Sequence, residues 1–296
     1  MRSPTASARR SAARPGEPAP APERAHLPDL TPTPLPVRLF RAGRLALHLV
    51  SGVLQVALFF PFCAKDLRDH AVARWSARLL GILNVRAVVT GGPPRSPGRH
   101  AVLVANHVSW LDIQLIHSVW QVRFVAKSEV RRWPVIGWLS ARVGTLFIRR
   151  GRGRHAARIN EAIHEAFRRG DAIGVFPEGT TSDGSELTRF HASLLQPAVD
   201  EDALVYPAAL RYLDAAGNVC RQASYVGDAS LLESMRMIFR QRTIVAELRF
   251  LPAIDAVGRT RRELAAAAQA VIAEALNLRV SDRKPEIAAD PRDARR

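Results

Sequence analysis

Cysteine and tyrosine are scarce in this sequence of 296 residues. The two cysteines, Cys63 and Cys220, lie in unrelated contexts and form no metal-binding or redox motif, which suits a reducing compartment. The chain has three tyrosines, no basic strand studded with aromatics and no zinc-finger spacing. Because these are the usual signatures of nucleic-acid recognition, we expect no nucleic-acid partner.

Acidic residues are also few, since 27 Asp and Glu stand against 43 Lys and Arg, which gives a formal net charge of +16. Such a charge favours an anionic partner: nucleic acid, an anionic membrane face, or an acidic protein or phosphorylated substrate. Of these, the membrane has direct support in the sequence.

That support is an uncharged run of about twenty residues from Leu45 to Ala64, long enough for a hydrocarbon core of about 30 Å. It starts too deep in the chain for an ordinary secretory signal, and no small-residue cleavage site follows it. Polar residues interrupt the run, and the next segment, 71–83, is amphipathic. Two linked helices dipping into one leaflet therefore explain the pattern at least as well as one membrane span. A hairpin buried in a soluble core is the third alternative.

Composition divides the chain into four parts. Residues 1–35 are rich in Pro, Ala and Arg and are expected to be disordered, as is the tail 278–296. Residues 36–83 form the membrane-associated helical segment. The segment 84–277 remains as one catalytic domain.

Short β-rich runs alternate with helical periodicity in this domain. The expected strands are 85–89, 101–105, 122–126, 145–148, 172–176, 204–210 and 245–250, and the expected helices are 110–120, 135–143, 155–169, 193–199, 230–240 and 261–276. The alternation predicts an α/β fold with a mixed, largely parallel sheet flanked by helices. In such sheets ligands bind where strands end, and His107, Lys127, Arg149 with Arg150, and 177–179 each follow a predicted strand.

The segment from Asn106 to Asp112 (NHVSWLD) places a histidine and a carboxylate five residues apart. Within one helix the two side chains would diverge by about 140°. If the chain instead turns at His107 and begins a helix near Ser109, His107 can fold back onto Asp112. An imidazole oriented by a carboxylate can deprotonate a hydroxyl group. The alternative is an ordinary helix start, with Ser109 or Asp112 as cap.

A second block, FPEGTTSDG, starts at Phe176. Proline ends the strand and Gly179 accepts positive φ, so the chain turns sharply and presents Glu178. Such a turn can bind an anion or fix a substrate hydroxyl, although it can also be a plain strand exit. Between the two blocks lies an arginine-rich stretch, 149–154, of which one or two residues are expected to be phosphate ligands.

These blocks, in this order, resemble the glycerolipid acyltransferase family typified by bacterial 1-acyl-sn-glycerol-3-phosphate acyltransferases. The resemblance lies in NHVSWLD at 106–112, in 144–150, in FPEGTTS at 176–182 and in the proline-containing segment 205–207, and it covers roughly residues 85–215. Lys127 to Glu129, followed by Pro134 and Gly137, also fits the family.

The resemblance implies that His107 is the general base and Asp112 its orienting partner. Substrate would be bound by a larger set of residues: Lys127, Arg149, Arg150, Glu178, Gly179 and Thr180. The hydroxyl of a lysophospholipid would attack an acyl thioester of acyl-carrier protein or coenzyme A directly, with no metal, no cofactor and no acyl-enzyme. The absence of a Gly-x-Ser-x-Gly nucleophile pattern is consistent with this. The enzyme would work at the cytoplasmic face of the inner membrane, on an anionic surface.

Two departures from the family pattern concern the acceptor. Thr181 stands where the family has the arginine associated with the acceptor phosphate, and His191 replaces a lysine. The expected acceptor is 1-acyl-sn-glycerol-3-phosphate, which would give phosphatidic acid, and lyso-ornithine lipid or another lysolipid is the alternative. A non-catalytic basic membrane-binding protein with the same fold is the alternative from another class.

Overall fold

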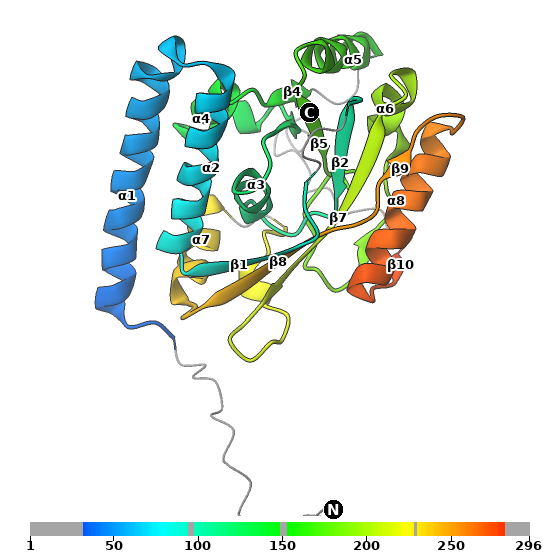
Figure 1. Ribbon diagram of the computed structural model, residues 1–296. Helices are drawn as coiled ribbons and strands as arrows, with labels where there is room; N and C mark the ends of the chain where they lie inside the picture. The colour runs from blue at the N-terminus through cyan, green and yellow to red at the C-terminus, as the bar shows by residue number, and fades with distance from the viewer. Residues whose placement is uncertain (1–31, 94–97, 149–152, 228–229, 282–296) are drawn as a thin grey trace, which may run out of the picture.

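The computed structural model describes residues 32–93, 98–148, 153–227 and 230–281. In these ranges the chain alternates strands and helices around one main sheet (Figure 1). The α-helices are α1 (Leu35–Leu58), α2 (Lys65–Ile82), α3 (Leu111–His117), α4 (Ile136–Arg142), α5 (Gly153–Arg168), α6 (Gln196–Asp200), α7 (Leu231–Arg240) and α8 (Arg261–Leu276). The strands are β1 (Val85–Thr90), β2 (Ala101–Ala105), β3 (Val122–Lys127), β4 (Leu146–Ile148), β5 (Ala172–Val175), β6 (Leu187–Thr188), β7 (Leu204–Leu213), β8 (Ile244–Phe250), β9 (Ile254–Asp255) and β10 (Val280–Ser281). Four 3-10 turns complete these elements: η1 (Phe60–Phe62), η2 (Val130–Arg132), η3 (Ala192–Leu195) and η4 (Arg221–Ala223).

The main sheet has the strand order β1-β8-β7-β2-β5-β3-β4, with β9 paired to β7. Most neighbours are parallel, while β8 and β9 run antiparallel to β7. The expected mixed, largely parallel α/β sheet is therefore confirmed. Strand β2 lies near the middle, between β5 and β7, so its carboxyl end opens at the centre of the sheet edge.

Helices cover both faces of the sheet, and β2 shows how the two cores are built. All five of its residues are buried. Leu103 and Ala105 pack into the cluster on the side of α2, α3 and α7, whereas Val102 and Val104 pack into the cluster on the side of α5 and α8. The alternation follows from the two-residue period of a strand, and a strand buried on both faces has to be apolar throughout.

The expected elements agree closely with the structure. Strand β2 and helix α8 match residue for residue. The one helix expected at 193–199 is divided into η3 and α6, and Pro197 stands in the first turn of α6.

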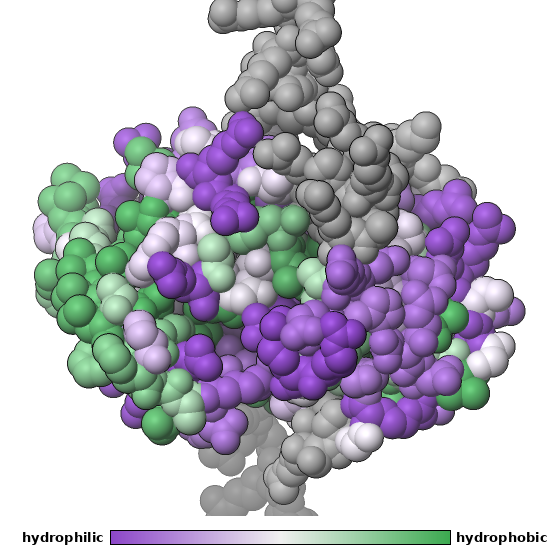
Figure 2. Space-filling model, turned by 90° about the horizontal axis from the view of Figure 1, so that it is seen from above, coloured by the Kyte–Doolittle hydropathy of each residue, from purple (hydrophilic) through white to green (hydrophobic). Residues whose placement is uncertain are grey.

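Helices α1 and α2 form a hairpin against the α3 and α7 side of the domain (Figure 1). The segment Leu35–Phe62 is long and apolar enough to cross a membrane, and 22% of its most apolar window is buried. The exposed side chains of α1 include Phe40, Leu47, Val50, Leu54 and Leu58. Figure 2 shows hydrophobic surface gathered on the side where α1 lies. The hairpin is therefore not the buried core hairpin of a soluble protein.

The domain extends four residues past the boundary expected at 277. Asn277 ends α8 in the left-handed conformation, which turns the chain back toward the domain. The carbonyl of Arg279 then accepts the N–H of Leu187, and β10 pairs with β6. Residues 278–281 thus belong to the fold, although a two-residue strand leaves no periodic pattern in the sequence.

Candidate active site

Where the chain leaves β2 toward α3, a side chain continues the hydrogen bonding of β2 with β7. Asn106 follows the last residue of β2. Its amide Nδ2–H donates to the carbonyl of Leu210 over 2.9 Å, and its Oδ1 accepts the N–H of the same residue over 2.7 Å. The side chain thereby replaces one step of the parallel ladder with β7. Both backbone groups of the following residue are left available for other partners.

His107 uses both of these backbone groups. Its N–H donates to Oε1 of Glu178 over 2.7 Å, and its carbonyl accepts the N–H of Ser182 over 2.8 Å. The loop that follows β5 therefore holds the backbone of the histidine from both sides.

The imidazole of His107 is fixed by two contacts. Its Nδ1 lies 2.7 Å from Oδ2 of Asp112, the second residue of α3. Its ring stacks on Phe176 with 3.9 Å between the ring centroids and 9° between the planes. The turn after β2 and the helix start that the sequence predicted are both present. With Nδ1 engaged, Nε2 is the nitrogen left for a substrate, and it has no hydrogen-bond partner among the described residues.

Asp112 is fully buried and accepts four hydrogen bonds. Besides the imidazole, Oδ2 accepts the N–H groups of Val108 over 2.7 Å and Ser109 over 2.9 Å. Oδ1 accepts the hydroxyl of Tyr212 over 2.6 Å. A buried carboxylate with this many donors is held in one orientation.

The turn after β5 has the conformation expected from its sequence. The N–H of Gly179 donates to the carbonyl of Phe176 over 3.0 Å, and φ of Gly179 is 70°. Glu178, however, is 0% exposed, and its Oε2 accepts both the N–H and the hydroxyl of Thr188. Burial raises the pKa of Glu178, and the donors of His107 and Thr188 act against that rise. The carboxylate faces the protein, in contrast to the substrate-facing placement that we expected.

A cavity of about 1940 Å³ lies beside His107. It runs between the α1–α2 hairpin, α3, the η2–α4 segment and the loop after β5, and its walls include Leu49, Trp75, Ile113 and Leu139. Ligand pockets typically measure about 300–1,000 Å³, so this space is large enough for a long apolar molecule together with its polar head.

The cavity brings several of the predicted site residues together. Lys127, Gly179 and Thr180 line it together with His107. Asp112 and Glu178 stand behind His107. The predictions for Arg149 and Arg150 lie outside the described residues. Among the residues that are described, no group of three or more His, Cys, Asp and Glu side chains is arranged to hold a metal ion.

The two positions that depart from the family pattern, Thr181 and His191, also line the cavity. The hydroxyl of Thr181 donates to the carbonyl of Tyr225, and the N–H of His191 donates to the carbonyl of Pro177. Three carboxylates line the same cavity: Glu129, Asp183 and Glu186.

Sequence reasoning missed the residues that act on the site from a distance. Tyr212 is one hundred residues from Asp112, and Thr188 belongs to the two-residue strand β6. Phe176 and Ser182 stand inside the recognised block, yet their stacking and backbone contacts leave no local signal. Asn106 could have been found, because a buried amide directly after an apolar strand needs backbone partners.

Comparison with known proteins identifies the family of the chain. The protein-family model described as Acyltransferase matches residues 84–211. A lyso-ornithine lipid O-acyltransferase of Pseudomonas aeruginosa is 39% identical over 210 residues, which cover 71% of this chain and 80% of that protein. A 1-acyl-sn-glycerol-3-phosphate acyltransferase of Neisseria meningitidis is 36% identical over 220 residues, 74% of this chain and 85% of that protein.

The fold also matches a solved structure, the 1-acyl-sn-glycerophosphate (LPA) acyltransferase PlsC of Thermotoga maritima. The match has a TM-score of 0.58 at 20% identity and covers 82% of this chain and 94% of the other. The chain belongs to the glycerolipid acyltransferase family and is an O-acyltransferase that acts on lysolipids. The non-catalytic alternative is not supported.

Proposed function

We propose that His107 is the general base that activates the hydroxyl of the lysolipid acceptor. The observation that carries this proposal is the placement of its imidazole: Nδ1 is bound to Asp112 at 2.7 Å, the ring is stacked on Phe176, and the residue lines a large apolar cavity. A neutral imidazole whose Nδ1–H is held by a carboxylate presents Nε2 as a proton acceptor.

The reaction then needs one bond to form and one to break. Nε2 of His107 takes the hydroxyl proton while the hydroxyl oxygen attacks the thioester carbonyl carbon. The new C–O bond forms the ester, the C–S bond breaks, and the thiolate leaves with the proton from His107. Asp112 supports the imidazolium during this step. In this proposal Glu178 acts through the backbone of His107, whereas Lys127, Gly179 and Thr180, with Arg149 and Arg150, hold the substrate.

For the acceptor we propose first 1-acyl-sn-glycerol-3-phosphate, which gives phosphatidic acid. Lys127 lines the cavity with His107, and Arg149 and Arg150 follow β4 in sequence, and basic side chains of this kind bind phosphate groups. The relative from Neisseria meningitidis carries the name of this activity.

A second acceptor, lyso-ornithine lipid, is favoured by the charges of the cavity. Thr181 and His191 stand in place of an arginine and a lysine, and Glu129, Asp183 and Glu186 line the same space. Carboxylates repel a phosphate but attract the ammonium group that ornithine carries. The relative from Pseudomonas aeruginosa carries the name of this second activity.

For the donor we propose a thioester of acyl-carrier protein or coenzyme A, because both are strongly anionic and the net charge of the chain is +16.

For the location we propose the cytoplasmic face of the inner membrane. Helix α1 contacts α4 near one end and α7 near the other (Figure 1). Because a helix that lies along the catalytic domain cannot also cross the bilayer, we propose that it lies in the membrane interface.

The test is a donor-by-acceptor matrix with the full-length protein in lipid vesicles. Acyl-carrier protein and coenzyme A thioesters are each combined with lysophosphatidic acid and lyso-ornithine lipid, and products are identified by mass spectrometry. His107→Ala should lower the rate by about 10²–10⁴-fold or more with the preferred pair. Acyl transfer at the wild-type rate by correctly folded His107→Ala would overturn the mechanism. The acceptor that is acylated faster decides between the two acceptor proposals.

A further inference from the structure

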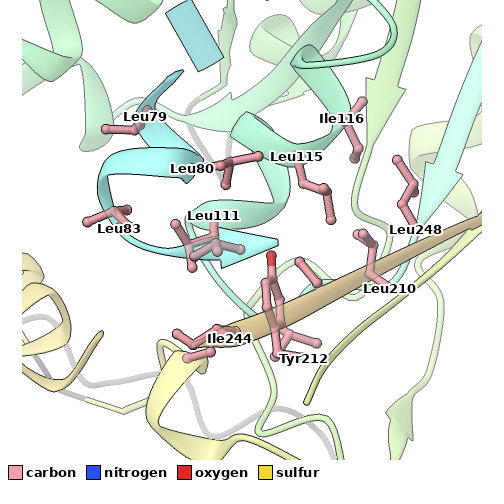
Figure 3. Packing of buried hydrophobic residues seen from close by; sticks show 14 of the residues in the cluster. Leu79, Leu80, Leu83, Leu111, Leu115, Ile116, Leu210, Tyr212, Ile244 and Leu248 are labelled. Carbon is pink, nitrogen blue, oxygen red and sulfur yellow. The ribbon is translucent and has the colours of Figure 1, made fainter. Parts of the chain in front are cut away.

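The hydroxyl of Tyr212 reaches the carboxylate that orients the base proposed above. Its oxygen lies 2.6 Å from Oδ1 of Asp112, and neither side chain is open to solvent, with 2% and 0% exposed. Figure 3 shows the tyrosine ring among Leu111, Leu210 and Ile244, with its hydroxyl directed to the side of α3. The bond joins β7, at the centre of the sheet, to the first turn of α3.

The two oxygens of Asp112 have different partners. Oδ2 accepts the bonds from His107, Val108 and Ser109, all within five residues in sequence. Oδ1 accepts from Tyr212, which is its one donor among the described residues. Without this hydroxyl, Oδ1 would be a buried anionic oxygen with no partner, and the carboxylate would gain freedom to rotate away from the imidazole.

Tyr212 is itself held by the sheet. It pairs with Ala246 in the antiparallel register of β7 and β8, and its ring belongs to the buried cluster on the α2 and α3 side. Burial raises the pKa of Tyr212 well above its ordinary value, so the phenol keeps its proton and stays a donor throughout the physiological range. The hydroxyl therefore has a fixed position and a fixed role as donor.

We propose that Tyr212 is a positioning residue for acyl transfer, which holds Asp112, and through it the imidazole of His107, with Nε2 directed to the cavity. The proposal rests on the function proposed above, in which His107 takes the proton of the acceptor. Tyr212 is not among the described residues that line the cavity. It acts through one hydrogen bond, so a substitution that removes only the hydroxyl isolates its contribution.

The test is Tyr212→Phe in the full-length protein with its preferred substrates. The value of kcat should fall roughly tenfold to a hundredfold, as expected when a hydrogen bond to a charged group is lost, with KM little changed. The acid limb of the pH profile of kcat/KM should also move to higher pH. A carboxylate with one donor fewer binds the proton of His107 more strongly, so the base stays protonated to higher pH. Among the described residues, the other titratable group bonded to His107 is Glu178, which is unchanged in this variant.

Tyr206→Phe is the matched control. Tyr206 is on the same strand, packs edge-on against Trp120 and has no described contact with His107 or Asp112. It should leave both kcat and the acid limb unchanged. Wild-type kcat and pH profile in Tyr212→Phe would overturn the proposal, and so would a loss of stability alone with normal kcat in the folded protein.

Site-specific 3-fluorotyrosine at position 212 covers the case in which Tyr212→Phe fails to fold. The fluorinated phenol is a stronger donor of nearly the same size, so the acid limb should move to lower pH. An unmoved limb would overturn the proposal. His107→Ala is measured in parallel. If His107→Ala is inactive while the substitutions at position 212 leave kcat and the acid limb unchanged, only the positioning role of Tyr212 is refuted. If His107→Ala is active, the proposal that His107 is the general base is refuted as well.

Discussion

The N–H of His107 donates to Oε1 of Glu178 over 2.7 Å, which joins the ends of two neighbouring parallel strands, β2 and β5. The other oxygen of the same carboxylate accepts two bonds from Thr188, and no part of Glu178 is exposed. All of these donors belong to the protein. In the proposed mechanism, Glu178 therefore influences the chemistry through the position of His107.

Glu178→Gln tests this relationship. The amide has one acceptor oxygen in place of two and turns an NH₂ group toward donors of His107 or Thr188, so the free energy of unfolding should fall by about 1–3 kcal/mol. Because His107, the proposed base, is displaced, kcat should fall while KM for the acceptor changes little. Steady-state kinetics and urea denaturation measure the two effects. Glu274→Gln, on the exposed surface of α8, is the control. A large rise in KM with unchanged kcat would instead assign Glu178 to substrate binding.

The part of the site that could be read from the sequence is the part that is local in sequence. His107 and Asp112 are five residues apart, and a strand exit followed by a helix start is enough to bring them together. Helices and strands could also be predicted from the sequence where the hydrophobic pattern is continuous. Strand β2 is a five-residue apolar run, and α8 starts at a capping box of Thr260 and Glu263.

The rest of the site depends on contacts between distant strands. Tyr212 contacts Asp112 because β7 lies beside β2, and no sequence pattern near residue 212 indicates this contact. Glu178 follows a strand, where a carboxylate is usually exposed. Its burial follows from the loop that returns over it through Thr188. The sequence motif therefore indicated that Glu178 belongs to the site, whereas only the packing shows which atoms its carboxylate contacts.

The close approach of α1 and α2 depends on Gly52. A Cβ at this position would lie 2.6 Å from Nε1 of Trp75. Trp75 cannot easily retreat, because its indole stacks on His48 and its Nε1–H donates to the carbonyl of His48. Gly52→Ala should therefore lower the free energy of unfolding by about 1–3 kcal/mol through overpacking.

Gly43→Ala is the matched control on the same helix, because a Cβ there meets nothing within 4 Å. It should raise stability by up to about 1 kcal/mol through helix propensity. Thermal denaturation of the two variants measures the difference. Equal stabilisation by both would show that the two helices are not packed as described.

The buried histidine of α3 predicts a pH dependence of stability. Burial lowers the pKa of His117, whose Nε2 contacts the carbonyl of Val122 at 3.0 Å. The unfolded chain takes up a proton at this residue below about pH 6.5, whereas the folded chain resists it. The free energy of unfolding should therefore fall as the pH decreases below 6.5, by up to about 1.4 kcal/mol per pH unit from this one group.

Urea denaturation of wild type and His117→Gln at pH 7.0 and 5.5 checks this dependence. Glutamine keeps an amide donor for Val122 and does not titrate, so the loss of stability on acidification should be smaller by about 1 kcal/mol. His70→Gln, on the exposed face of α2, should behave as wild type does. An equal loss of stability in wild type and His117→Gln would contradict the prediction, because it would show that His117 takes up its proton as readily in the folded protein as in the unfolded chain.

The exposed apolar face of α1 predicts membrane binding through side chains that do not build the fold. Leu47 and Leu54 are 72% and 51% exposed and lie two helical turns apart on one face. Burying a leucine is worth about 1.5–3 kcal/mol, so Leu47→Asp/Leu54→Asp should weaken binding to phosphatidylglycerol vesicles at least tenfold in a sedimentation assay. Val257→Asp is the control: this valine is 56% exposed but precedes α8, on the side of the domain away from α1 (Figure 1). Circular dichroism should show both proteins folded, because neither substitution alters a buried contact. If both bind vesicles as wild type does, the basic surface alone accounts for membrane association, and that binding should then disappear at high salt.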